Sequence, residues 1–211
     1  MSTPSADPRL LIATATRVLA HAGMFDMHGH ISLRVGDIAY IGDRGAPRIS
    51  IAPGQVAAVR VSDGARLDDA TPPSELAMHL AAYRARPDIA SASHFHPRYA
   101  TAFAVAGRPL VVASNAGAFF GCTIPVHDDP ELIRTDELGA PVARDLGAAA
   151  AVLLRGHGAL VVGANVPECV TAALYLEESA HRNHLAATLG AVKAYTDDEI
   201  ARVRAMLASP F

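Results

Sequence analysis

Two short apolar runs, separated by only four residues, constrain the fold of this chain most strongly. Residues 151–154 read AVLL and residues 159–162 read ALVV, and the sequence between them is Arg155-Gly156-His157-Gly158. A short apolar run bounded by glycine is typical of a strand that is buried on both faces. Two such strands joined by a tight glycine turn predict the middle of a sheet that helices cover.

The rest of the chain alternates between helical and strand patterns, which predicts one α/β domain with a mixed sheet. Ser74 follows two prolines and is expected to cap a helix that ends near Pro87. Pro97 is expected in the first turn of another helix. Further helices are expected at residues 8–22, 136–147, 167–189 and 197–207. Further strands are expected at residues 31–33, 48–51, 89–96, 110–112 and 123–126.

Composition excludes several classes of protein. The chain has 211 residues, 51% hydrophobic and 18% charged, which fits one globular domain and excludes a disordered chain. Its formal net charge of −3 argues against binding to a nucleic-acid backbone, and no apolar window is long enough to predict a membrane span. The first seven residues lack the pattern of a secretion signal, and Cys122 and Cys169 provide no disulfide framework. We therefore expect a cytoplasmic protein.

Ten histidines in one chain suggest a metal site. His94 and His96 are two residues apart in an expected strand, so both side chains point to one face and can bind one cation. The alternative is that this pair arose by chance in a histidine-rich chain. His157 lies between two glycines that let the backbone bend; the alternative is a solvent-exposed turn residue. Glu75 at a helix start is either a catalytic carboxylate or simply a favourable helix-end charge.

Four ordered motifs resemble the class II aldolase/adducin family. They are Pro73-Ser74-Glu75, His94-Phe95-His96-Pro97, Gly156-His157-Gly158 and the segment GHISLR at residues 29–34. The resemblance extends from about residue 9 to residue 190, nearly the whole chain. It implies a single three-layer α/β/α domain around a mixed sheet, here residues 1–211, and a homo-oligomer, usually a tetramer with sites between neighbouring subunits.

The same resemblance implies the roles of four side chains. His94, His96 and His157 would bind one divalent metal ion per subunit, most often zinc, with manganese, iron or cobalt as alternatives. Glu75 occupies the position of the family's catalytic acid/base.

The chain departs from the family members that cleave sugar phosphates. A threonine and an asparagine of the usual phosphate-binding box are replaced by Met27 and His30, and the segment Ala52-Pro53-Gly54 is matched to a second box that normally carries hydroxyl groups. Residues 110–114 contain no tyrosine at the place where these aldolases use one. Ser74 remains. Loss of several donors disfavours a phosphate substrate.

A carboxylate is the expected substrate anion instead. His28, Arg34 and Arg155 lie in or beside the motif loops, and an arginine side chain matches a carboxylate with two parallel hydrogen bonds. His30, in its protonated form, and Ser74 are also expected to contact the substrate. The alternatives are a structural ion pair for Arg34 and a surface loop residue for His28.

The motif variants look most like family members that decarboxylate hydroxylated aromatic or ring-opened acids, such as dihydroxyphthalate and carboxy-2-hydroxymuconate semialdehyde decarboxylases. The resemblance therefore implies a lyase of aromatic catabolism that releases CO2 through a metal-stabilised enolate, with Glu75 handling the proton. One alternative is an aldolase acting on a non-phosphorylated hydroxy-oxo acid. The other is a non-catalytic, adducin-like binding protein, although such members usually lack the metal histidines.

Overall fold

One mixed sheet of seven strands forms the centre of the computed structural model, which describes residues 7–208. The strands follow the spatial order β3-β2-β1-β4-β7-β6-β5. All neighbouring strands are antiparallel except β5 and β6. Their bounds are β1 His30–Val35, β2 Ile38–Gly42, β3 Val56–Arg60, β4 Ser91–Phe95, β5 Val126–His127, β6 Ala151–Leu154 and β7 Gly158–Gly163.

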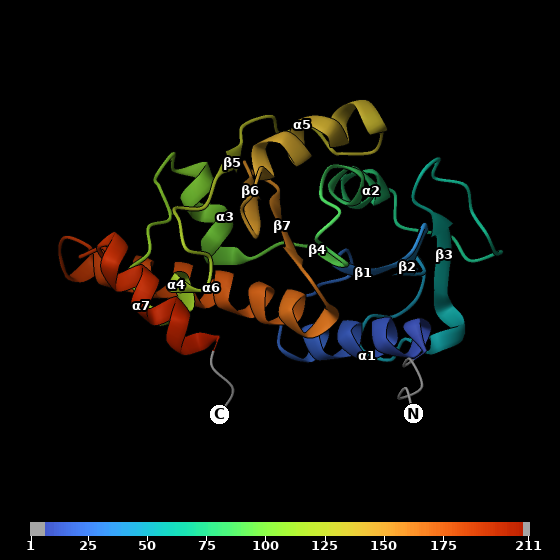
Figure 1. Ribbon diagram of the computed structural model, residues 1–211, viewed down its shortest axis with the longest axis horizontal. Coiled ribbons are helices and arrows are strands. Elements are labelled where there is room, and N and C mark those ends of the chain that lie inside the picture. Colours follow the sequence, from blue (N-terminus) through green and yellow to red (C-terminus); the bar gives the residue numbers. More distant parts are fainter. Residues whose placement is uncertain (1–6, 209–211) are drawn as a thin grey trace.

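Helices cover both faces of this sheet (Figure 1). Helices α1 (Pro8–His21) and α6 (Val166–Leu189) lie along one face, and α2 (Leu76–Ala85) and α5 (Asp136–Leu146) lie along the other. The remaining helices are η1 Pro53–Gln55, α3 Arg98–Val105, α4 Asn115–Ala118 and α7 Asp197–Leu207. The predicted single three-layer α/β/α domain is confirmed over the described residues, and the termini of the expected span 1–211, including most of the segment searched for a secretion signal, lie outside them.

Strands β6 and β7 form the buried centre, as their apolar sequences predict. Their register pairs Leu153 with Ala159 and Leu154 with Gly158, so the turn between them is tight. Leu153 and Ala159 pack toward α1 and α6, whereas Val152 and Leu160 pack toward α2 and α5. This alternation lets every side chain of the two strands contribute to a core on one face or the other.

The predicted helix starts rest on identifiable caps. Asn165 accepts a hydrogen bond from the backbone N–H of Glu168 at the start of α6, and Thr196 and Glu199 form a reciprocal capping box on α7. Ser74, however, does not cap α2: the N-cap residue is Glu75, and its side chain makes no capping bond. The carboxylate of Glu75 is therefore directed elsewhere. Among the described residues, no helix is long and apolar enough to cross a membrane.

Three of the expected strands are corrected by the structure. Residues 48–51 form a turn, because the Arg48 guanidinium is buried and donates to the carbonyls of Gly29, Asp43 and Ala46. Residues 110–112 join no sheet ladder, although Leu110 is buried in the core. Of residues 123–126, only Val126 is in a strand, the short edge strand β5.

Candidate metal centre and substrate cavity

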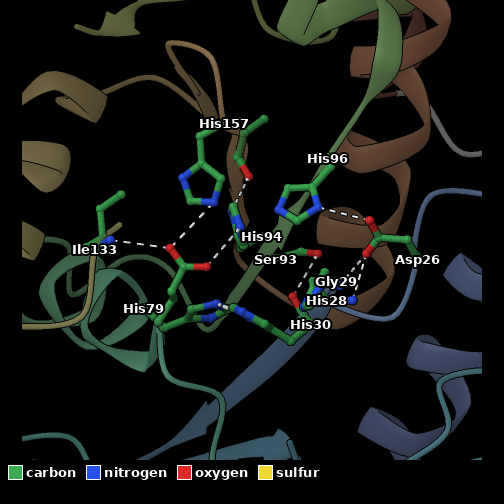
Figure 2. A network of polar contacts seen from close by, with 12 residues as sticks. Asp26, His28, Gly29, His30, His79, Ser93, His94, His96, Ile133 and His157 are labelled. Carbon is green, nitrogen blue, oxygen red and sulfur yellow. Dashed lines mark hydrogen bonds and ion pairs between the residues drawn. The ribbon is translucent and has the colours of Figure 1, made fainter. Parts of the chain in front are cut away.

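Strand pairing brings four of the predicted site histidines to one end of the sheet. Antiparallel pairing places His30 of β1 opposite His94 of β4, and Phe95 opposite Ala159 of β7. His96 follows directly after β4, beside the turn that carries His157. The potential ligand atoms of His94, His96 and His157 lie within 4.8 Å of one another. Figure 2 shows the three rings turned toward a common point. The structure thus brings the three side chains together, and their binding of a metal ion stays a prediction.

Two glycines make this approach possible for different reasons. A Cβ atom on Gly158 would lie 2.4 Å from the Phe95 carbonyl oxygen and 2.9 Å from the His96 ring, so no larger residue fits there. Gly156 adopts φ = +72°, a conformation that residues with a Cβ rarely take. Gly158 is therefore required for the close strand contact, and Gly156 is required for the turn.

The hydrogen bonds of the rings leave ligand nitrogens available for a cation. His94 Nδ1 lies 3.0 Å from the carbonyl oxygen of Ala159, and His96 Nδ1 lies 3.1 Å from Oδ2 of Asp26. An oxygen partner places the ring proton on Nδ1 and leaves the lone pair on Nε2. Both Nε2 atoms are buried, and no hydrogen-bond partner for them exists in the described part of the chain. Such converging, unsatisfied imidazole nitrogens fit a divalent metal ion.

Glu75 lies beside these histidines rather than pointing into solvent. Its Oε2 is 3.7 Å from His94 Nε2, its Oε1 is 3.5 Å from His157 Nε2, and the backbone N–H of Ile133 donates to Oε1 at 3.3 Å. Burial raises the pKa of Glu75, but the interactions with His157 and His94 and the hydrogen bond from the Ile133 N–H together lower it to about 2. The carboxylate is therefore ionised near neutral pH.

The histidine cluster opens into a cavity of about 930 Å³. Of the predicted site residues, six line this cavity: His28, His30, Ser74, Glu75, His96 and His157. His94 is fully buried behind them. Three arginines that were not predicted from the sequence, Arg44, Arg48 and Arg134, also line it.

Arg34 and Arg155 lie elsewhere. Arg34 donates to the backbone carbonyls of Tyr83, Pro87 and Ile89, and none of the cavity-lining positions is Arg34. Arg155 is directed outward, where it donates to the backbone and the carboxylate of Asp128. The structure thus replaces the expected carboxylate-binding role of Arg34 by a structural one, because three carbonyls occupy its guanidinium.

Two further expectations about anion binding are corrected. His30 is buried, and burial together with the neighbouring His79 and His94 holds its pKa well below the ordinary value, so the ring is neutral and not the expected cation. The segment Ala52-Pro53-Gly54 contributes to η1 and does not reach the cavity. Residues 44–49, in the loop after β2, line the cavity instead.

Two residues at the site were not predicted from the sequence. Buried His79 contacts the cavity residue His30, with 2.9 Å between His79 Nε2 and His30 Nδ1. His79 follows Glu75 by four residues on α2, which places both on one helix face and was an available signal. Asp26 positions His96, and its other oxygen accepts from the backbone N–H of His28 and Gly29. No spacing rule identifies Asp26.

Known proteins resemble this chain in sequence and in fold. The chain is 35% identical to a 3,4-dihydroxyphthalate decarboxylase from Terrabacter sp., over 92% of this chain and 87% of that protein. A 3,4-dihydroxyphthalate decarboxylase from Rhodococcus jostii is 33% identical, over 90% and 84%. The fold is similar to that of a solved L-fuculose 1-phosphate aldolase, with a TM-score of 0.87, 24% identity and coverage of 96% and 97%. Residues 11–184 match the class II aldolase and adducin N-terminal domain, and the chain therefore belongs to this family.

Proposed function

We propose that this protein is a divalent-metal-dependent carbon–carbon lyase that decarboxylates a hydroxylated aromatic or 2-hydroxymuconate-type acid. The observation that carries the proposal is the convergence of three imidazoles, two of which keep a buried, unsatisfied Nε2, beside an ionised carboxylate in a cavity with three arginines. The names of the two decarboxylase relatives, each at least 33% identical, support the choice of reaction.

His94, His96 and His157 would hold the metal ion. Imidazole ligands favour zinc, with manganese, iron and cobalt as alternatives. When bound, the cation would supply Lewis-acid stabilisation of negative charge on a substrate oxygen. His94 is suited to this role because burial lowers its pKa to about 3, which keeps the ring in the neutral, ligating form.

Glu75 would move the proton that the reaction needs. In its ionised form it accepts a proton from a substrate hydroxyl or from a water molecule. The bond between the substrate carbon and its carboxylate then breaks, CO2 leaves, and the bonding electron pair stays with the substrate. Glu75 returns the proton to that carbon and is ionised again. The oxygen that gave up the proton takes one from solvent, so overall the carboxylate leaves as CO2 and a proton replaces it.

The arginines would bind the anionic substrate. Arg44 and Arg134 are exposed at the cavity, and Arg48 is buried in its wall. The segment from Asp43 to Arg48 contains no serine or threonine, so it offers guanidinium groups rather than the hydroxyls that suit a phosphate. This lining supports a substrate with a carboxylate.

Product analysis of the zinc-loaded protein tests the proposed function. The protein would be incubated with 3,4-dihydroxyphthalate, a 2-hydroxymuconic acid and L-fuculose 1-phosphate. We expect CO2 from one of the two acids in equal amount to the substrate consumed. Release of an aldehyde or ketone without CO2 would instead establish an aldolase. A folded protein that binds no divalent ion and turns over none of them would favour a binding protein.

Arginine variants test the substrate-binding part. Arg44→Gln and Arg134→Gln should each raise KM for the acid about tenfold, because a hydrogen bond to a charged group contributes about 1.5–3 kcal/mol. Arg155→Gln is the matched control, since this arginine is exposed in the turn that carries His157 but lies outside the cavity. An equal effect in all three variants would show a general charge effect rather than binding in the cavity.

A further inference from the structure

Four side chains form a continuous hydrogen-bonded chain from the core to the cavity. Tyr83 Oη lies 2.7 Å from Ser32 Oγ, and Ser32 Oγ lies 2.7 Å from His79 Nδ1. His79 Nε2 in turn lies 2.9 Å from His30 Nδ1, and His30 lines the cavity. All four residues are buried (Figure 2 shows the contact between the two rings). Among the described residues, the one other acceptor near the Ser32 hydroxyl is the carbonyl oxygen of Ala92, at 3.5 Å.

The number of available protons decides which atom donates and which accepts in each of these hydrogen bonds. Each hydroxyl has one proton and each neutral imidazole has one. If Tyr83 donates to Ser32 and Ser32 donates to His79 Nδ1, the His79 proton is on Nε2 and donates to His30 Nδ1. Every proton then lies in a contact of normal length, and the remaining His30 proton is on Nε2.

The opposite direction leaves a buried proton poorly placed. If His79 Nδ1 donated to Ser32, the Ser32 proton would have to go to Tyr83 or to the Ala92 carbonyl. In the first case the Tyr83 proton has no acceptor among the described residues. In the second case the Ser32 bond spans 3.5 Å, longer than a normal O–H···O hydrogen bond. Buried polar groups rarely remain unpaired in this way.

We propose that Tyr83, Ser32 and His79 hold His30 in the tautomer protonated at Nε2, so that His30 donates one hydrogen bond to a substrate oxygen and does not ligate the metal. Tyr83, Ser32 and His79 are positioning residues in this arrangement. The tautomer follows from the hydrogen bonds alone, whereas the donation to substrate rests on the proposed function.

This assignment distinguishes two overlapping groups of potential metal ligands. The ligand atoms of His30, Glu75 and His94 lie within 4.8 Å of one another, as do those of His94, His96 and His157. A nitrogen that carries a proton has no lone pair for a cation. The proposed tautomer therefore excludes His30 from coordination and leaves the three motif histidines as the metal ligands.

Nitrogen NMR of histidine-labelled protein tests the tautomer directly. Long-range proton–nitrogen correlations distinguish a protonated from an unprotonated ring nitrogen, and the signals lost in His30→Gln identify His30. In metal-free and zinc-loaded wild-type protein we expect a protonated Nε2 and an unprotonated Nδ1. A proton on His30 Nδ1, protons on both nitrogens, or a mixture of tautomers would overturn the proposal.

Ser32→Ala tests whether the hydroxyl chain sets this state. We expect a mixture of His30 tautomers in this variant and a smaller change in Tyr83→Phe, which leaves the Ser32 hydroxyl in place. Ser91→Ala is the matched control: Ser91 is equally buried on the neighbouring strand, but it donates to the Ser32 carbonyl and has no contact with the rings. A Ser32→Ala spectrum identical to wild type would overturn the positioning role. If Ser32→Ala fails to fold, the wild-type measurement still decides the tautomer.

Kinetics of the zinc-loaded protein test the donation to substrate. His30→Ala should lower kcat/KM by roughly one to two decades, and His30→Asn, which keeps an N–H donor, should recover part of this loss. Equal losses in both variants would contradict the donor role. If the NMR result holds but no acid releases CO2, the proposed function fails while the tautomer stands.

Discussion

Five histidines at one end of the sheet fall into two groups that differ in the partners of their ring nitrogens. In the first group, His94 and His96 each bond to an oxygen through Nδ1 and keep a buried, unpaired Nε2. In the second group, His30 and His79 bond to each other, and His79 also bonds to Ser32. His157 joins the first group through its contact with Glu75 and its own unpaired Nδ1.

The comparison shows that the partner of one ring nitrogen decides the use of the other. An oxygen acceptor at Nδ1 leaves Nε2 as a ligand, which is the arrangement that metal sites use. In His30, by contrast, Nδ1 accepts a hydrogen bond from His79, so the proton of the His30 ring is on Nε2 and makes that nitrogen a hydrogen-bond donor. The same residue type therefore serves as metal ligand in one group and as hydrogen-bond donor in the other, although His30 and His94 are directly opposite each other in the sheet.

The largest expected effect separates the two groups by metal content. His94→Ala, His96→Ala and His157→Ala should each abolish stoichiometric zinc binding, because each removes one of three imidazole ligands. His30→Gln and His79→Asn are the controls and should keep about one zinc ion per chain. Elemental analysis of folded, dialysed protein measures this. A folded His157→Ala variant with full zinc content would contradict the assignment.

Glu75 lies between the two groups and should matter for the reaction rather than for metal binding. Glu75→Gln keeps the size of the side chain but cannot accept a proton, so kcat for decarboxylation should fall about 10²–10⁴-fold. Zinc content should stay near one ion per chain.

Glu168→Gln is the matched control for Glu75, because Glu168 is also at a helix start but lies in the first turn of α6, outside the cavity. Loss of a helix-end charge costs only about 0.3–1 kcal/mol of stability. If Glu75→Gln kept full activity, Glu75 would be no more than such a charge.

Much of the first group could be predicted from the sequence because its geometry is local. His94 and His96 share a strand face by the two-residue period, and His157 is fixed between glycines in a turn of three residues. The fold was also predictable in outline, since the two apolar runs could only be central strands. Only the strand register, which sequence alone does not give, shows that the two motifs meet.

The second group depends on contacts between residues far apart in the sequence, so its arrangement was largely not predicted from the sequence. His79 was not among the predicted site residues, although its spacing from Glu75 places both on one face. Arg34 was expected at the site because it belongs to the same motif as His30. A strand rises about 3.3 Å per residue, so Arg34 lies roughly 13 Å farther along β1 than His30. That distance, available from the sequence, separates Arg34 from the cavity.

Sequence patterns also misjudged the loop that lines the cavity. Residues 48–51 have the composition of a strand, but the buried Arg48 folds them into a turn by bonding to three backbone carbonyls. Tertiary contacts of this kind override local preference. The same hydrogen bonds bring the segment from Arg44 to Arg48 to the cavity. Its arginines could therefore not be predicted as cavity residues from the sequence.

A smaller effect concerns the oxygen partner that defines the first group. Asp26→Asn weakens the hydrogen bond to His96 Nδ1 and should lower zinc affinity about 10–100-fold, as other losses of a ligand's hydrogen-bond partner do. Asp145→Asn is the matched control, because Asp145 pairs with His127 at 2.6 Å away from the cavity. Competition with a zinc chelator measures both affinities. Equal affinity of Asp26→Asn and wild type would show that the partner of His96 does not tune the metal.

The smallest expected effect tests the burial of the second group through the pH dependence of stability. Burial lowers the pKa of His79 from the ordinary 6.5 to about 3. Between these values the unfolded chain binds a proton at this ring and the folded protein does not. The free energy of unfolding therefore falls as the pH drops through this window, by about 1.4 kcal/mol per pH unit for one ring.

His79→Asn removes that proton-binding group from both states, which isolates its share of the pH dependence. Urea unfolding of metal-free protein between about pH 6 and pH 5 should give a slope about 1.4 kcal/mol per pH unit smaller than that of wild type. The absolute stability of the variant is expected to be lower at every pH, because two buried hydrogen bonds change, so only the slope is informative. An unchanged slope would mean that His79 binds protons equally in both states. The second group would then no longer consist of buried, neutral rings, and its contrast with the metal histidines would rest on the hydrogen-bond geometry alone.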